Sequence, residues 1–299
     1  MKTDKLRESQ HIDDRRGQTS SQNNYTNASN PLFSALFSRL GWKGKLILVL
    51  VLVAFGGISG LGGLLGSNSS SPQSVTSHQT TSQSSQATDQ EAQFLSKVLA
   101  STEDFWSQEF QKNGRQYDFP TMVYYTDSVQ TACGQGSAQA GPFYCSGDQK
   151  IYIDLSFYRE LGDKYGAKGD FAMAYVVAHE VGHHIQEELG IMSQYNKQRQ
   201  GLSEKEANAL NVRLELQADY YAGAWAKYVQ DNKLLDTDDI QEAMTAAHAV
   251  GDDTLQKQAY GRTIPDSFTH GTSKQRQTWF NRGYQYGDIQ HGDTFNSNI

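Results

Sequence analysis

The feature that most constrains this chain of 299 residues is the pentapeptide His-Glu-Val-Gly-His at residues 179–183. On a helix, two histidines four positions apart place both imidazoles on one face, which suits two nitrogen ligands of one tetrahedral zinc ion. Glu180 follows the first histidine, so its carboxylate can reach a water molecule at the metal without binding the metal itself. The pattern predicts zinc-assisted hydrolysis of a peptide bond.

The residues around this motif have the periodicity of an amphipathic helix. Apolar side chains recur at steps of three and four, which marks one buried face. The two histidines flank that face rather than lying opposite it. This placement counts against the alternative interpretation, a helix with two surface histidines and a solvated glutamate. The apolar residues are Phe171, Ala174, Ala178, Val181, Ile185 and Leu189.

A candidate third ligand lies in a second helical segment, which runs from Ser203 to about Tyr228. Ser203 and Glu206 form a capping-box pair at its start. Glu215 and Asp219 are four positions apart and share one face. Two histidines and Glu215 would supply the three protein ligands of a catalytic zinc ion, which keeps a fourth position for water. Asp219 could then accept the other ring N–H of a ligand histidine, although an ordinary solvated acidic pair is the alternative.

Short motifs along most of the chain resemble those of the YpfJ-like family of bacterial neutral zinc metallopeptidases, which are zincins with a glutamate as third ligand. So many pieces in one order are more specific than the pentapeptide alone. The resemblance spans most of the chain apart from the Ser- and Gln-rich stretch. The matching segments are Asp14–Gly17, Ala132–Gly134, Gly141–Cys145, Ile151–Asp154, His179–Gln186, Leu214–Trp225, Ala249–Asp253, Phe268–Thr272 and Asp293–Phe295.

The resemblance implies a zinc ion bound by His179, His183 and Glu215. It also implies the same catalytic base as the spacing argument. The chain departs from the family at Tyr220 and His291, where many members carry cysteine. If those two cysteines pair in the relatives, the chain has lost one bridge that anchors the C-terminal tail. The resemblance implies no particular physiological substrate.

An uncharged apolar segment at residues 46–66 is long enough to cross a lipid bilayer. Lys and Arg precede it and are absent from residues 67–90, so the positive-inside rule predicts a single-pass membrane protein with a cytoplasmic N-terminus. A cleaved signal peptide is the alternative, and the length and position of the segment count against it. We therefore expect a disordered cytoplasmic tail at 1–45, a transmembrane helix at 46–66, a Ser/Thr/Gln-rich linker at 67–90 and an extracytoplasmic zinc metallopeptidase domain at 91–299.

Charge and cysteine content limit the partners and the compartment. The net charge is −7, and residues 1–45 contribute +4 of it, which leaves −11 for the rest of the chain. An acidic domain of this kind argues against nucleic-acid binding. Cys133 and Cys145 both lie in the domain that we expect outside the cytoplasm, where disulfides form. We expect a disulfide between them, with two free buried thiols as the alternative.

The order of elements predicts a mostly helical α+β domain. Short strands are expected at Thr121–Tyr125 and Lys150–Leu155, with a loop between the cysteines. In zincins, a strand ahead of the histidine helix commonly lies at the edge of the active cleft. We expect the second strand to bind extended peptide through such an edge, and a strand buried in the sheet is the alternative. Further helices are expected at Gln90–Gln111, Asp236–Val250, Asp252–Tyr260 and Thr272–Tyr284.

Peptide hydrolysis also needs a hydrogen-bond donor for the developing oxyanion. His270 is the first candidate and Tyr221 the second, whereas a role at the entry of a helix is the alternative for His270. The favoured function is a membrane-anchored zinc endopeptidase with Glu180 as general base, one catalytic Zn²⁺ ion and a peptide or protein substrate. The alternatives are a catalytically inactive, zinc-stabilised surface domain and an interaction domain with incidental histidines.

Overall fold

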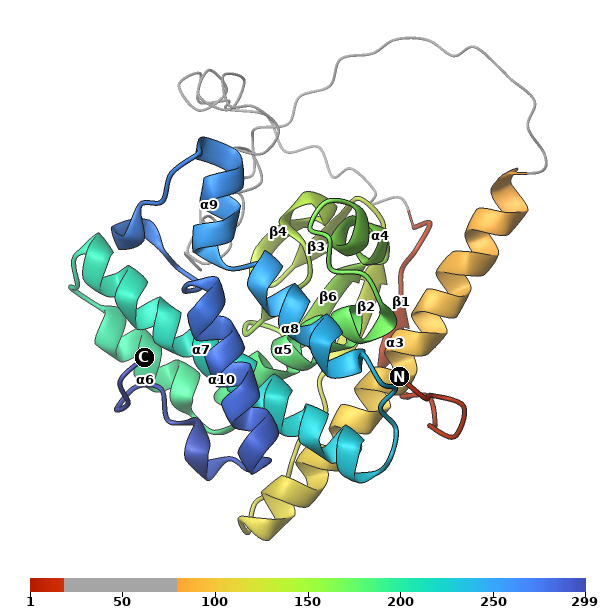
Figure 1. The fold of residues 1–299 in the computed structure, drawn as a ribbon. Coiled ribbons are helices and arrows are strands. Elements are labelled where there is room, and N and C mark those ends of the chain that lie inside the picture. Colours follow the sequence, from red (N-terminus) through yellow and green to blue (C-terminus); the bar gives the residue numbers. More distant parts are fainter. Residues whose placement is uncertain (19–79) are drawn as a thin grey trace.

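The computed structural model describes residues 1–18 and 80–299. The predicted transmembrane segment at 46–66 lies outside the described residues, as do residues 19–45 of the predicted tail and residues 67–79 of the predicted linker. Among the helices of the described ranges, none is both long and apolar enough to cross a bilayer. The described residues form a mostly helical α+β fold, in agreement with the predicted class (Figure 1).

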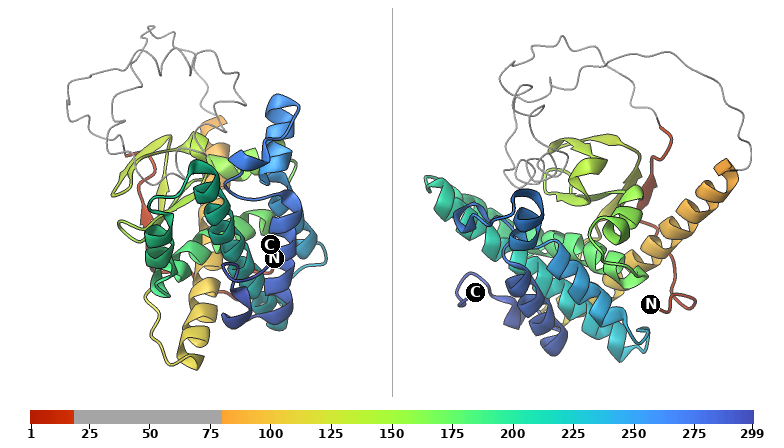
Figure 2. Two further views of the ribbon diagram at one scale, coloured as in Figure 1. Left: turned by 90° about the vertical axis from the view of Figure 1, so that its left-hand side faces the viewer. Right: turned by 45° about the horizontal axis from the view of Figure 1, so that its top comes forward.

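Four helices pack against one another to form the largest layer of the fold (Figures 1 and 2). α7 contacts both α5 and α10, and α8 contacts the same two helices. α7 and α10 cross with their backbones in close contact. A Cβ atom at Gly223 or Gly283 would collide with the backbone of the other helix, so this approach requires glycine at both positions. The four helices are α5 (Asp170–Glu188), α7 (Glu204–Asp231), α8 (Asp239–Ala249) and α10 (Ser273–Tyr286).

Capping residues define where α7 and α10 begin. Ser203 and Glu206 make the predicted capping box at the start of α7. Thr272 and Gln275 make a second one at the start of α10. Each box satisfies backbone N–H groups that have no partner inside the helix. Gly287 ends α10 in the left-handed conformation, at φ 69°.

A four-stranded sheet lies beside the helices, in the order β1-β2-β6-β5. β1, β2 and β6 are parallel, and β5 pairs antiparallel with β6. β2 and β6 are almost fully buried, which explains why they read as apolar and aromatic runs. The strands, with a separate hairpin of β3 and β4, are β1 (Ile12–Asp14), β2 (Thr121–Tyr125), β3 (Ser128–Thr131), β4 (Gly134–Ser137), β5 (Phe143–Cys145) and β6 (Lys150–Asp154).

The predicted strand at Lys150–Leu155 is β6, but its predicted place at the edge of the sheet is wrong. β6 is hydrogen-bonded to β2 on one side and to β5 on the other, so neither edge is free to bind a peptide. β5 has the terminal position instead. It lies in the stretch between the cysteines that was expected to be a loop. A strand of three residues carries too little periodicity to be recognised there.

Residues 1–18 also differ from the disordered tail expected for residues 1–45. Ile12–Asp14 form β1, which pairs with β2 and lies between β2 and α3 in Figure 1. The expectation rested on polar composition, which indicates too little apolar surface to order a segment alone. Here the segment is ordered by backbone pairing and by ion pairs with distant residues, and composition does not report either of these.

The helix expected at Gln90–Gln111 is longer than predicted, and β2 follows it in the chain. α3 begins at Thr80, so it includes the second half of the predicted linker. Its buried aromatic side chains pack against the helical layer, with the Trp106 ring edge-on to Tyr221 at a centroid distance of 5.4 Å. The remaining helices are α3 (Thr80–Lys112), α4 (Ser156–Asp163), α6 (Ile191–Arg199) and α9 (Asp252–Tyr260).

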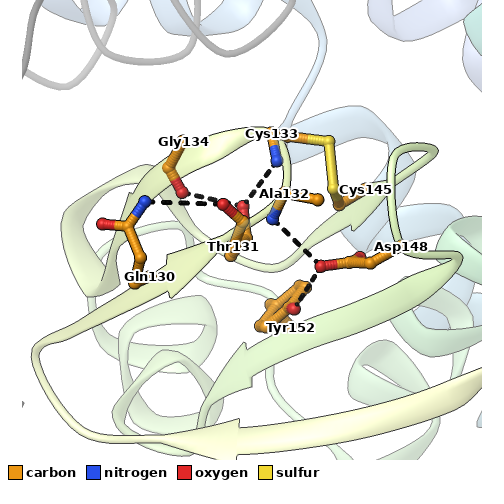
Figure 3. The surroundings of a disulfide bond; sticks show 8 residues. All are labelled: Gln130, Thr131, Ala132, Cys133, Gly134, Cys145, Asp148 and Tyr152. Carbon is orange, nitrogen blue, oxygen red and sulfur yellow. Dashed lines mark hydrogen bonds between the residues drawn. A yellow bond between two sulfur atoms is a disulfide. The ribbon is translucent and has the colours of Figure 1, made fainter.

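The expected disulfide between Cys133 and Cys145 is present and ties the β3–β4 hairpin to the last residue of β5 (Figure 3). Thr131 shapes the turn, because its hydroxyl accepts from the Cys133 N–H and donates to the Gly134 carbonyl. Asp148 accepts a hydrogen bond from the Ala132 N–H on the other side of the turn. The hairpin and the terminal strand therefore form one cross-linked unit.

Candidate metal centre

The histidine motif lies in the middle of α5. His179 and His183 share one face of the helix, with ring centroids 4.9 Å apart and ring planes at 88°. His179 and Glu180 are each only 7% exposed, so the site is largely closed to bulk water. The apolar residues expected to form the buried face of this helix are buried, apart from the half-buried Leu189. Core packing on that face therefore fixes the direction of the two imidazoles.

α5 and α7 are in close backbone contact at the motif. A Cβ atom added to Gly182 would lie 2.9 Å from both the Cα and the carbonyl oxygen of Ala218. Gly182 directly precedes His183, and Ala218 directly precedes Asp219. The close approach of the two backbones therefore brings the acidic face of α7 against the histidine face of α5.

Glu215 completes a group of three potential metal ligands. Its Oε2 lies 3.3 Å from Nε2 of His179 and 3.6 Å from Nε2 of His183. One ligand atom from each of the three residues lies within 4.8 Å of the other two. Glu215 is 8% exposed, so this carboxylate is almost fully withdrawn from water. Two imidazoles and a carboxylate form a donor set that suits zinc.

The far nitrogen of each imidazole is bonded to an acceptor. His179 donates from Nδ1 to Oδ1 of Asp219 at 2.9 Å, as the sequence had suggested for this aspartate. His183 has Nδ1 at 2.9 Å from Oε1 of Gln186. The amide nitrogen of Gln186 donates to the Leu214 carbonyl, which leaves its oxygen to accept from His183. Both histidines therefore use Nδ1 for these contacts and turn Nε2 toward Glu215, where a metal ion would take the deprotonated nitrogen as a ligand atom.

Arg276 supports Asp219 from α10, and it was not among the site residues predicted from the sequence. It donates to both oxygens of Asp219, from Nε at 2.8 Å and from Nη2 at 3.0 Å. The Tyr175 hydroxyl donates to Oδ1 of the same carboxylate at 2.6 Å. Arg276 is only 4% exposed, and a buried arginine requires a charged partner. Arg276 lies three and four positions before Trp279 and Phe280 on the buried face of α10, and this spacing is the sequence signal that could have found it.

The pKa values of the site show that its buried acids and histidines stabilise each other's charged forms. Burial opposes the ionisation of Glu215, yet the neighbouring histidines hold its pKa well below the usual value. Burial also opposes protonation of His179, but Asp219 outweighs it and raises the pKa of His179 to about 9. The pKa of His183 is raised for a similar reason, through Glu215. A divalent cation would replace these extra protons, so the residues fit zinc.

Glu180 differs from the other two acids of the site. Burial raises its pKa, while the charges of His179 and His183 act in the opposite direction without overcoming it. The backbone of Tyr144 in β5 also interacts with the Glu180 carboxylate. Glu180 therefore faces the terminal strand of the sheet and has the raised pKa that suits a general base.

Comparisons with known proteins identify the family. A family model described as "Putative neutral zinc metallopeptidase" matches residues 1–295. The chain belongs to this metallopeptidase family. It is 44% identical to the uncharacterized protein YpfJ of Escherichia coli (strain K12) over 296 residues, which cover 98% of both chains.

A second relative of the metallopeptidase family is the uncharacterized protein Rv2575 of Mycobacterium tuberculosis (strain ATCC 25618 / H37Rv). It is 44% identical over 192 residues, which are 60% of this chain and 64% of the relative. No solved structure matches the chain significantly. The comparisons therefore confirm the resemblance that the motifs indicated, and they attach no substrate to it.

His270 is partly buried and is influenced by the charge of the candidate ligand Glu215. Burial opposes its protonation, but the charges of Glu215 and Asp252 outweigh burial and raise its pKa. One carboxylate oxygen of Asp252 accepts from the N–H groups of Thr269, His270 and Gly271, at 2.6 to 3.0 Å. This holds the turn that carries His270. Tyr221, the second candidate for an oxyanion donor, instead lies in the core against Trp106.

His184 connects α5 to β5, the strand that Glu180 faces. It accepts from the Tyr144 hydroxyl at Nδ1, at 3.1 Å, and donates from Nε2 to the Asp118 carbonyl at 2.7 Å. The carbonyl can only accept, which assigns the proton to Nε2. His184 is 1% exposed. It therefore fixes the position of β5 relative to α5.

The two positions at which many family members carry cysteine lie beside one carboxylate. The Tyr220 hydroxyl donates to Oδ1 of Asp288 at 2.9 Å, and His291 bonds Oδ2 through Nδ1 at 2.7 Å. A Cβ atom on the adjacent Gly292 would collide with the Tyr220 ring. Polar contacts through Asp288 therefore hold the C-terminal tail against α7.

A second acidic group in the described residues has a different explanation. Asp170, Asp239 and Glu242 also offer oxygens within 4.8 Å of one another. The amine of Met1 forms ion pairs with Asp170 at 2.9 Å and Asp239 at 3.2 Å. Glu242 accepts from the Phe171 N–H at 3.0 Å. These carboxylates are thus occupied by protein groups at the start of α5.

Proposed function

We propose that this protein is a zinc-dependent endopeptidase whose metal is held by His179, His183 and Glu215. The observation that carries the proposal is the convergence of these three ligand atoms within 4.8 Å of one another, beside the buried Glu180. Membership of the metallopeptidase family supports the same chemistry. A bound zinc ion supplies Lewis-acid polarisation and lowers the pKa of water to about 7.

Glu180 and His270 are the proposed proton-handling groups. Glu180 accepts the proton of the attacking water and then delivers it to the nitrogen of the leaving amine. Its raised pKa brings it closer to the neutral range, where it can do both. His270 carries a raised pKa beside Glu215 and is held by Asp252, so its protonated ring can donate to the developing oxyanion.

The terminal strand β5 is the proposed binding edge for the substrate. It pairs with β6 on one side only, and no strand of the described residues pairs with its other side. The backbone of Tyr144, the central residue of β5, faces the Glu180 carboxylate. An extended peptide added to this edge would pass beside the base and the ligands. This replaces β6, the strand proposed from the sequence.

The Glu180→Gln variant tests the role of the base. We expect it to bind zinc with unchanged stoichiometry and to lose at least about 99% of peptide hydrolysis, since general-base catalysis contributes roughly 10²–10⁴-fold. Glu187→Gln, a change on the same helix that leaves the ligand group intact, is the matched control and should retain activity. A Glu180→Gln protein that digests a peptide library at the rate of the unaltered chain would exclude this assignment.

Metal analysis separates the proposal from its rival, an inactive zinc-stabilised surface domain. The purified chain should contain one zinc ion per molecule and should lose hydrolysis on chelation and regain it when zinc is added back. The rival predicts the same zinc content with no hydrolysis of any library peptide. An interaction domain with incidental histidines predicts no stoichiometric zinc at all.

Backbone N-methylation of substrate tests the binding edge. Single N-methyl groups placed along a cleaved peptide should raise KM at alternate positions only, because alternate residues of an added strand bond to its neighbour. A uniform effect along the peptide, or none, would remove β5 from the proposal. Neither outcome of this test bears on the proposed zinc ligands, which metal analysis tests separately.

Membrane attachment through residues 46–66 is a further part of the proposal. It is supported by the length of the uncharged apolar segment. The full chain should sediment with membranes and should be released by detergent but not by high salt. Recovery of the full chain in the supernatant without detergent would contradict attachment.

A further inference from the structure

Residues 1–18 are bonded into the fold through the backbone of β2. Ile12 lies opposite Met122 and Asp14 opposite Tyr124 in a parallel register. The pairing extends beyond the strand at both ends, because the Met122 N–H donates to the His11 carbonyl and the Arg15 N–H donates to the Tyr124 carbonyl, each at 2.8 Å. β1 thus closes the edge of β2 that would otherwise be exposed.

A buried carboxylate on α3 depends on the same segment. The Glu103 side chain has no exposed surface. Its charge is met by Arg7 at 2.8 Å, by the Ser9 hydroxyl at 2.5 Å and by His11 at 2.9 Å. All three partners come from residues 1–18. A buried carboxylate requires such compensation, because a charge that is withdrawn from water and left without partners strongly destabilises the fold.

Further bonds attach the segment to elements that are far apart in the chain. Ser9 donates its backbone N–H to Oγ of Ser96 in α3 at 3.1 Å. Arg16 forms an ion pair with Asp89 at 3.0 Å. The Lys2 N–H donates to the Leu234 carbonyl, just beyond α7, at 2.7 Å. The segment therefore contacts α3, the sheet and the helical layer that carries the ligands.

We infer that residues 1–18 and residues 80–299 fold as one unit and lie on the same side of any membrane to which the chain is attached. A single crossing at residues 46–66, as predicted from the sequence, would separate the two parts and leave Glu103 and the edge of β2 without their partners. The docked segment and the single-pass topology exclude each other in one chain. This inference does not rest on the zinc chemistry, so either can fail alone.

Two variants of the full chain, each with one added cysteine, test on which side of the membrane the two parts lie. The native cysteines are bonded to each other, and the sequence has no others. Lys5→Cys and Thr278→Cys place one free thiol in each part at an exposed position. A membrane-impermeant maleimide applied to intact cells, and then to permeabilised cells, should give the same pattern for both variants. Labelling of one thiol in intact cells and of the other only after permeabilisation would overturn the inference.

A cross-link tests docking itself. Ser9→Cys combined with Ser96→Cys should form a disulfide on mild oxidation of the full chain, because the two residues are hydrogen-bonded neighbours. A recognition site for a specific protease, inserted at residues 67–79, makes the result visible. After cleavage and denaturation without reductant, the two parts stay joined only when they are cross-linked. Ser9→Cys with Thr278→Cys is the control and should separate. Separation of the first pair, in a chain whose Cys133–Cys145 bond is intact, would overturn docking.

Discussion

Arg276 donates one hydrogen bond to each carboxylate oxygen of Asp219, in a pair that is almost fully buried. Asp219 in turn accepts the Nδ1 proton of His179, so an arginine on α10 is linked to a candidate metal ligand on α5 through an acid on α7. The pKa of Asp219 is lowered to about 2, because Arg276 and His179 outweigh the opposing effect of burial. The position of one ligand thus depends on three helices.

Asp219→Asn should weaken zinc binding by about 10–100-fold, the usual effect of losing an acceptor behind a ligand histidine. It would also leave the Arg276 charge without its carboxylate, so the metal-free protein should be less stable. Competition with a chelator measures the first effect and urea unfolding the second. Asp288→Asn, which alters an aspartate–histidine pair away from the metal centre, should leave zinc affinity unchanged. Equal affinities in the two variants would contradict this role of Asp219.

Gly182→Ala should destabilise the protein by about 1–3 kcal/mol, the typical cost of adding a methyl group where packing leaves no room. The added Cβ would meet the backbone of Ala218, which cannot rotate away. Because the shift would separate the histidines from Glu215, zinc affinity should fall as well. Gly162→Ala is the control, since its Cβ would make an ordinary contact of 3.6 Å with Lys168. A Gly182→Ala protein as stable as this control would show that the helices can part freely.

Removal of zinc should make stability fall as the pH rises from 6.5 to about 9. The pKa of His179 is about 9 in the folded, metal-free chain against an ordinary 6.5. A raised pKa stabilises the fold fully below 6.5 and is lost as the pH rises through the folded value. Urea unfolding of the metal-free protein at several pH values measures this. The zinc-loaded protein should show the opposite trend in metal affinity, because protons compete with the ion. A flat metal-free profile over that range is the contrary result.

The paired variant Tyr220→Cys/His291→Cys should form a disulfide that anchors the C-terminal tail. Both side chains form hydrogen bonds with Asp288, so the two positions lie close together in space. In the chain-entropy model, a bridge closing a loop of this length adds about 4 kcal/mol of stability. Thermal unfolding with and without reductant measures the gain, and each single variant serves as its control. Two free thiols in the folded double variant would show that the positions are too far apart.

Short-range patterns in the sequence predicted the fold class and the candidate ligands that the structure brings together. His179 and His183 follow from helical spacing, and Glu215 and Asp219 from the same spacing on a capped helix. The Cys133–Cys145 bond was expected from compartment and is present. These features depend on residues a few positions apart in the chain, so local periodicity records them.

Only the tertiary structure decided which distant groups support those ligands. Arg276 acts through hydrogen bonds to an acid on another helix, which no local spacing reports, and Gly182 matters only because Ala218 lies against it. The order of the sheet placed β5 rather than β6 at the edge and brought β1 into the fold. Pairing between strands more than a hundred residues apart is set by backbone hydrogen bonds and by compensation of buried charge such as Glu103. Neither leaves a periodic trace in the sequence.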